Sequence, residues 1–162
     1  MIRTIYRSLL LKALLLILLS ATIQSLSAQK SSEKVKSEIK EALKIWNTAA
    51  KSANVDRCMA LFDDSENIML IGSGNGEINK GKDEIKKWLS QIFGFAGFSR
   101  EMNRVDIDSN GKTAWVFMDG KMIVDFHKGG QKVTPYRFAG ILVKKKDGWK
   151  WRLFNGSVPQ KE

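Results

Sequence analysis

The sequence predicts an α+β fold: helices first, then an antiparallel sheet. Apolar residues recur at three- and four-residue spacing over residues 31–53 and 82–93, which is the period of an amphipathic helix. From Phe98 onward apolar and polar residues alternate instead, as in half-buried strands. Glycine-containing turns divide this second half into consecutive hairpins. Helices followed by a meander are typical of domains in which the helices cover one face of the sheet.

Residues 1–28 have the pattern of a secretory signal peptide. Basic residues near the start precede the apolar run Ala13–Leu19, and the small residues Ser27 and Ala28 precede the expected cleavage. The run is shorter than the ~20 residues that span a bilayer, so we expect no stable membrane anchor after cleavage. We therefore expect an exported protein, periplasmic or secreted, whose mature chain 29–162 forms a single domain.

The predicted elements of the first half follow from periodicity and capping. Residues 31–53 form a long helix, and Asn54 is a good N-cap for a short helix that carries Met59 and Phe62. The remaining elements are a strand over Ile68–Ile71, a loop or loose hairpin over residues 73–81, and a third helix over Lys82–Phe93.

The second half predicts four strands joined by hairpin turns. The turns contain Asn-Gly, Gly-Gly and Asp-Gly, which favour tight hairpins. The predicted strands are Glu101–Asp108, Thr113–Phe126, Lys132–Lys144 and Trp149–Ser157.

Composition excludes several classes of function. The net charge is +10, but the lysines are scattered, so we expect a solvated surface and no nucleic-acid partner. Cys58 is the only cysteine, which excludes an intramolecular disulfide, and its apolar surroundings predict a buried, inert thiol. With a single histidine, His127, no zinc site is expected, and we expect no metal or cofactor.

Two motifs match known sites only in part. Residues 76–82 resemble the start of a phosphate-binding loop, but Asp83 stands where a Ser or Thr must bind magnesium. Residues 106–111 resemble the start of a calcium loop, but Phe117 stands where the bidentate Glu belongs. A hairpin turn explains the second segment better.

The strand pattern predicts a small-molecule pocket. Arg137 lies on an otherwise apolar strand face, and Asn155 and Ser157 end the face begun by Trp149 and Trp151. Few polar groups in an apolar wall are typical of ligand pockets. The predicted pocket residues are Trp46, Trp88, Arg137, Asn155 and Ser157. The alternative is that the aromatic residues are core and that Arg137 lies at an edge, or pairs with an internal acid.

The order and spacing of several short segments resemble the SnoaL-like branch of the nuclear transport factor 2-like superfamily. These segments are Ala53–Asp56, Met59–Phe62, Gly81, Thr113–Trp115, Tyr136–Phe138, Asp147–Trp151 and Ser157 to Pro159. The resemblance covers residues 38–159 and implies a conical fold, a bent sheet around about three helices with a pocket at the open end. It also implies a dimer through the outer sheet face.

The resemblance to steroid isomerases of this fold implies that catalytic groups are missing. Their Asp base falls at Leu70, their oxyanion-binding Tyr at Trp46, and a frequent His at Asn155. Leucine cannot accept a proton, and an indole is a poor replacement for a phenol. Arg137 matches a basic pocket residue of related proteins. No catalytic residue is therefore assigned.

We expect an exported, non-catalytic pocket domain that binds a small apolar or carboxylate-bearing molecule. One alternative is an isomerase or hydro-lyase that uses Asp119 as base, although the apolar alternation of its strand points Asp119 away from the helices. The other alternative is a dimeric interaction module. Whether the protein is a pocket domain or an interaction module, we expect a homodimer through the outer sheet face, with Trp115 and Phe117 as anchors.

Overall fold

The structure is a computed structural model that describes residues 33–160. The chain divides into two compact units, Met1–Val35 and Lys36–Glu162, and all described strands belong to the second. The predicted signal, residues 1–28, lies outside the described residues. Among the helices that are described, none is both long and apolar enough to cross a membrane.

The described helices follow the sequence periodicity. They span residues 33–51, Val55–Met59 (α2) and Gly81–Phe93 (α3). The first helix buries one apolar stripe that includes Ile39, Leu43 and Trp46. Asn54 caps α2 as predicted, because its side-chain oxygen accepts a hydrogen bond from the Arg57 N–H at 2.9 Å.

The sheet contains the predicted meander and a short hairpin, which lies where the sequence predicts a strand followed by a loop or loose hairpin. Its strands are β1 Met69–Ile71, β2 Ile78–Lys80, β3 Ala96–Ser109, β4 Thr113–Phe126, β5 Gln131–Lys145 and β6 Gly148–Ser157. The spatial order is β2-β1-β6-β5-β4-β3. All neighbouring strands are antiparallel except β1 and β6, which are parallel and make the sheet mixed. The predicted fold class is confirmed, and this parallel pair is the departure from it.

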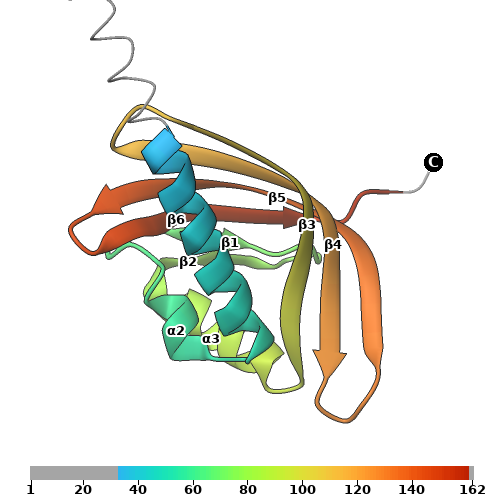
Figure 1. Cartoon of the computed structure of the whole chain (residues 1–162). Helices are drawn as coiled ribbons and strands as arrows, with labels where there is room; N and C mark the ends of the chain where they lie inside the picture. The colour runs from blue at the N-terminus through green and yellow to red at the C-terminus, as the bar shows by residue number, and fades with distance from the viewer. Residues whose placement is uncertain (1–32, 161–162) are drawn as a thin grey trace, which may run out of the picture. The chain divides into compact units, whose positions relative to one another are not determined.

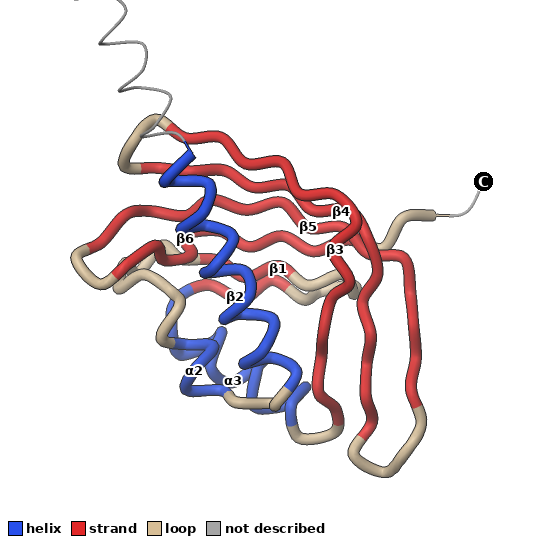
Figure 2. Tube along the Cα trace, viewed as in Figure 1, coloured by secondary structure: helices blue, strands red, loops and turns tan. Residues whose placement is uncertain are grey.

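The long strands bend, and their inner face curls toward the helices (Figure 1, Figure 2). β3 has a register shift between Met102 and Arg104, opposite Gly120 of β4. A Cβ atom on Gly120 would lie 2.0 Å from the Glu101 carbonyl oxygen, so only glycine allows the strands to approach this closely. Gly97 allows a similarly close approach between β3 and the end of the first helix. A Cβ atom added there would lie 2.2 Å from the Lys51 carbonyl oxygen. The two glycines thus permit the curl that leaves space under the helices.

The alternation of β4 assigns its two faces as predicted. Ala114, Val116 and Met118 are buried on the inner face of the sheet. Trp115 is 48% exposed on the other face, called the outer face below. Phe117 lies on the same outer face and is half-buried.

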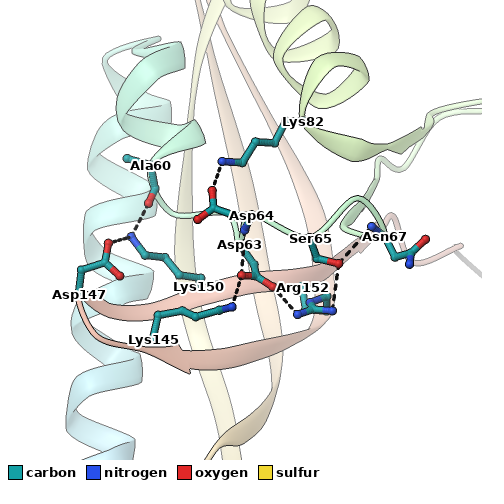
Figure 3. A network of polar contacts seen from close by, with 10 residues as sticks. All are labelled: Ala60, Asp63, Asp64, Ser65, Asn67, Lys82, Lys145, Asp147, Lys150 and Arg152. Atoms are coloured by element: carbon teal, nitrogen blue, oxygen red, sulfur yellow. Dashed lines mark hydrogen bonds and ion pairs between the residues drawn. The ribbon is translucent and has the colours of Figure 1, made fainter.

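A buried acid ties the segment after α2 to the sheet (Figure 3). The Asp63 side chain is only 1% exposed and forms ion pairs with Lys145, at 2.6 Å, and with Arg152. The Asp63 N–H also donates to the Trp151 carbonyl at 3.0 Å. Burial opposes ionisation of Asp63, but these cations and the Asp64 N–H outweigh burial and lower the pKa of the carboxyl. Ionised Asp63 therefore stabilises this junction.

Candidate ligand-binding cavity

A cavity of about 150 Å³ lies between the helices and the inner face of the sheet. Its wall is mainly aromatic and apolar and includes Trp46, Leu70, Trp88, Phe93, Phe98 and Phe154. The first helix contributes Trp46, α3 contributes Trp88 and Phe93, and strands of the sheet contribute the others. Apolar cavities of about this volume can hold one benzene-sized ring.

Arg100 brings a positive charge into this apolar wall. Its Nε and Nη1 atoms are buried, and neither has a hydrogen-bond partner within residues 33–160. The guanidinium carbon lies 5.8 Å from the ring centre of Trp46, 5.7 Å from that of Tyr136 and 5.5 Å from that of Phe154. Three aromatic faces thus surround the cation and stabilise it, while two of its donors stay free for an acceptor.

Asn47 of the first helix holds the backbone of Arg100 in place. The Arg100 N–H donates to the Asn47 Oδ1 at 2.6 Å, and the Asn47 Nδ2 donates to the Arg100 carbonyl at 3.2 Å. β3 is an edge strand of the sheet, so at this residue the Asn47 side-chain amide forms the hydrogen bonds that a neighbouring strand would otherwise form. The helix and the strand therefore fix together the point from which the Arg100 side chain enters the cavity.

The other polar lining groups are Tyr136, Glu77 and Ser73. Burial raises the pKa of the Tyr136 hydroxyl, the positive charge and hydrogen bonding of Arg100 lower it, and the charge of Glu77 raises it slightly. The net direction is upward, so Tyr136 is a neutral phenol at physiological pH.

Every unpartnered buried side-chain polar atom of the described cavity wall is an N–H donor. Besides the two Arg100 atoms, the Trp46 Nε1 is buried without a partner in the described chain. Buried donors without acceptors are unfavourable, and an anionic or carbonyl oxygen would satisfy them. The cavity is therefore complementary to an apolar molecule that carries an acceptor, and best to a negatively charged one.

Of the sequence-predicted pocket residues, the structure brings Trp46 and Trp88 to the cavity and leaves Arg137, Asn155 and Ser157 out of it. Arg137 lies on the outer face, where its Nε donates to the Asp119 Oδ1 at 2.6 Å. The predicted placement of Arg137 in the pocket is thus wrong. The neighbours of Arg137 on β5, Tyr136 and Phe138, are buried on the inner face instead. Asp119 is on the outer face as expected, so it does not line this cavity and cannot act there as the base that the isomerase alternative requires.

A β-bulge explains why Asn155 and Ser157 are misplaced. The pairing of β5 with β6 shifts between Ile141 and Leu142, which leaves Arg152 without a partner on β5. Alternation therefore breaks at Arg152: Trp149 and Trp151 are buried before it, and Phe154 is buried after it. Asn155 and Ser157 are exposed on the outer face as a result.

Sequence reasoning missed three polar residues of the cavity wall, Arg100, Tyr136 and Glu77. Arg100 falls before the predicted strand Glu101–Asp108, whereas β3 begins at Ala96. The alternation of Phe98, Arg100 and Met102 was the available signal, because it puts the guanidinium on the same face as an apolar side chain.

The outer face carries a second hollow of about 380 Å³. Trp115, Phe117, Ile141 and Leu153 line it, together with Asn155. This is the surface through which the sequence predicts a dimer.

Comparisons with known proteins agree with this architecture. The family profile described as a SnoaL-like domain matches residues 39–161. No curated protein matches the sequence.

Several solved structures share the fold. A candidate dehydratase of the nuclear transport factor 2-like family from Streptomyces avermitilis has a TM-score of 0.70 and 13% identity, over 80% of this chain and 99% of that one. A nuclear transport factor 2-like superfamily protein from Salmonella enterica serovar Typhimurium has a TM-score of 0.70 and 20% identity, over 80% and 94% of the two chains. A ketosteroid isomerase-like protein from Erwinia carotovora atroseptica has a TM-score of 0.63 and 21% identity, over 77% and 96%. Identities this low show the common fold and leave the activity open.

The profile match spans most of the chain, and the curled sheet with helices on its inner face is shared with these structures. The chain belongs to the SnoaL-like domain family, and its fold is that of the nuclear transport factor 2-like structures.

Proposed function

We propose that this protein binds a small, mainly apolar molecule with one anionic group in the cavity under its helices. The observation that carries the proposal is the Arg100 guanidinium, which has two buried donors without partners in the described chain and lies among three aromatic rings. A carboxylate satisfies such donors with charge-assisted hydrogen bonds. An apolar body of about one ring matches the cavity of about 150 Å³.

We propose binding rather than catalysis as the role of the site. The cavity wall has Leu70 and Trp46 where the resemblance puts the base and the oxyanion donor of steroid isomerases. Glu77, the carboxylate of the wall, already accepts a hydrogen bond from the Gly74 N–H at 2.6 Å. These features support a ligand that is held and not transformed.

Benzoate is a suitable probe because it combines one ring with one carboxylate. Calorimetric titration of the purified protein should give saturable binding. Arg100→Met keeps an apolar stem and removes the charge, so benzoate affinity should fall by about 1.5–3 kcal/mol, or roughly 10- to 150-fold.

Arg137→Met is the matched control, since it removes the same charge from the outer face. It should leave benzoate affinity unchanged. Equal binding of benzoate by the Arg100→Met variant and the unmodified protein would contradict the proposal, and so would equal affinity for benzoate and uncharged benzamide. Mass spectrometry of co-purifying molecules would then identify the natural ligand class.

We also propose that the protein acts outside the cytoplasm, on the strength of the signal pattern in residues 1–28. Amino-terminal sequencing of exported material should begin near Gln29. An intact Met1 in a membrane fraction would refute export by cleavage.

A further inference from the structure

The cavity wall carries two charged side chains of opposite sign, Arg100 and Glu77. Arg100 presents free donors to the cavity, as described above. Glu77 belongs to the turn between β1 and β2, which reaches the same cavity with Gly72 and Ser73. A ligand that pairs with Arg100 therefore also experiences the field of Glu77.

The Glu77 carboxylate is held in place by its own turn. Its Oε2 accepts from the Gly74 N–H at 2.6 Å. The side chain lies over Gly72, where a Cβ atom would be 2.1 Å from the same oxygen. Glycine at position 72 thus leaves the space that the carboxylate occupies.

The charge of Glu77 reaches the group beside Arg100. It contributes to the raised pKa of Tyr136, whose ring lies 5.7 Å from the Arg100 guanidinium carbon. The positive and negative charges of the wall therefore act on the same small volume. Arg100 can offset a single anionic group, whereas a second anionic group would meet the charge of Glu77 and no second cation among the lining residues.

We propose that Glu77 is a specificity-determining residue that restricts the cavity to monoanions, so that the ligand class is single-ring monocarboxylates with an uncharged far end. This inference rests on the proposed binding function and adds the selection against dianions. The favoured ligand neutralises Arg100 with its carboxylate and leaves only apolar or neutral atoms toward Glu77. Dicarboxylates of the same ring size are excluded by charge and not by shape.

Terephthalate and its monomethyl ester test this selection, because the ester lacks the second charge and is larger by one methyl group, so tighter binding of the ester cannot be an effect of size. The purified protein should bind the monoester at least about tenfold more tightly than terephthalate, a ratio expected for one unbalanced like charge at short range. In Glu77→Gln the ratio should fall to about threefold or less, while affinity for the monoester changes little. Glutamine keeps an oxygen that accepts from the Gly74 N–H, so the turn is retained.

Glu84→Gln is the matched control. Glu84 is exposed, and its Oε2 likewise accepts a backbone hydrogen bond, from the Lys80 N–H at 2.7 Å. It is not part of the cavity wall, so its variant should keep the tenfold ratio.

The possible failures are distinguishable. If benzoate binding depends on Arg100 but the ratio is the same in Glu77→Gln as in the unmodified protein, the selection is refuted and the binding function stands. If the unmodified protein binds the monoester and terephthalate equally, the selection is refuted even where the variant does not fold. If neither benzoate nor the monoester binds in an Arg100-dependent way, the proposed function fails and the inference fails with it.

Discussion

Replacing Asp63 by asparagine tests whether the buried ion pairs stabilise the junction between α2 and the sheet. The side-chain oxygen of the introduced asparagine could still accept from Lys145, but its amide group would face the Arg152 guanidinium, donor against donor. Removing one partner of a fully buried pair costs about 3–5 kcal/mol. The side chains of Lys145 and Arg152 are 44% and 37% exposed, so water solvates the freed cations in part. We therefore expect a loss of about 2–3 kcal/mol, or a fall in Tm of about 6–15 °C.

The pH dependence gives this prediction a second readout. The folded-state pKa of Asp63 is lowered, so its ionised form stabilises the fold above its unfolded pKa of about 3.9. That contribution is lost as the pH falls through the folded-state value. The free-energy difference between the unmodified protein and Asp63→Asn should therefore be full near neutral pH and shrink in acid. Urea unfolding followed by tryptophan fluorescence at a series of pH values measures the stability loss in Asp63→Asn and its dependence on pH.

Asp64→Asn is the control for this experiment. Asp64 is the adjacent acid, but its side chain is 90% exposed and its pair with Lys82 lies in solvent. Its loss should change stability by less than about 1 kcal/mol. Equal losses in the two variants would refute the assignment to Asp63, as would a loss that does not vary with pH.

Three further predictions address the curl of the sheet, the Cys58 thiol and the outer face. Gly120→Ala should destabilise the protein by about 1–3 kcal/mol in urea unfolding, because its Cβ would lie 2.0 Å from the Glu101 carbonyl oxygen. Unchanged stability would show that β3 can move away without cost and that the close approach does not require glycine. Burial raises the pKa of Cys58 to about 12, so a thiol-specific reagent near pH 8 should label it only after unfolding, and rapid labelling of the folded protein would contradict this. Because Trp115 is 48% exposed on the outer face, light scattering should give the mass of a homodimer for the unmodified protein and of a monomer for Trp115→Glu; a monomer for both at high concentration would rule out this dimer.

The sequence alone was sufficient where the decisive interactions are local. Helix periodicity, the Asn54 cap and the glycine turns predicted the elements, because each depends on residues only a few positions apart. The two faces of β4 were also predicted, since its alternation of apolar residues is regular over Ala114–Met118. The burial of Cys58 followed from its apolar neighbours in the same way.

The cavity could be predicted only in part. Trp46 and Trp88 were identified because aromatic residues on helix faces covering a sheet must meet its inner side. The choice between Arg100 and Arg137 depended on contacts over long sequence distances. Arg137 finds Asp119 on the neighbouring strand, whereas Arg100 is held by Asn47, 53 positions earlier in the chain. Local alternation puts both arginines on strand faces with apolar residues, so it does not distinguish them.

The tertiary structure decided which strand residues face the cavity. One inserted residue at Arg152 reverses the alternation of β6, because side chains on a strand alternate with a period of two. Asp63, which is distant in sequence and buried, forms an ion pair with the side chain of that inserted residue and accepts a hydrogen bond from it. The sequence by itself determined the elements and the apolar character of the cavity, whereas the identity of its charged groups was decided by a bulge, a helix-to-strand amide contact and the ion pairs that packing brought together.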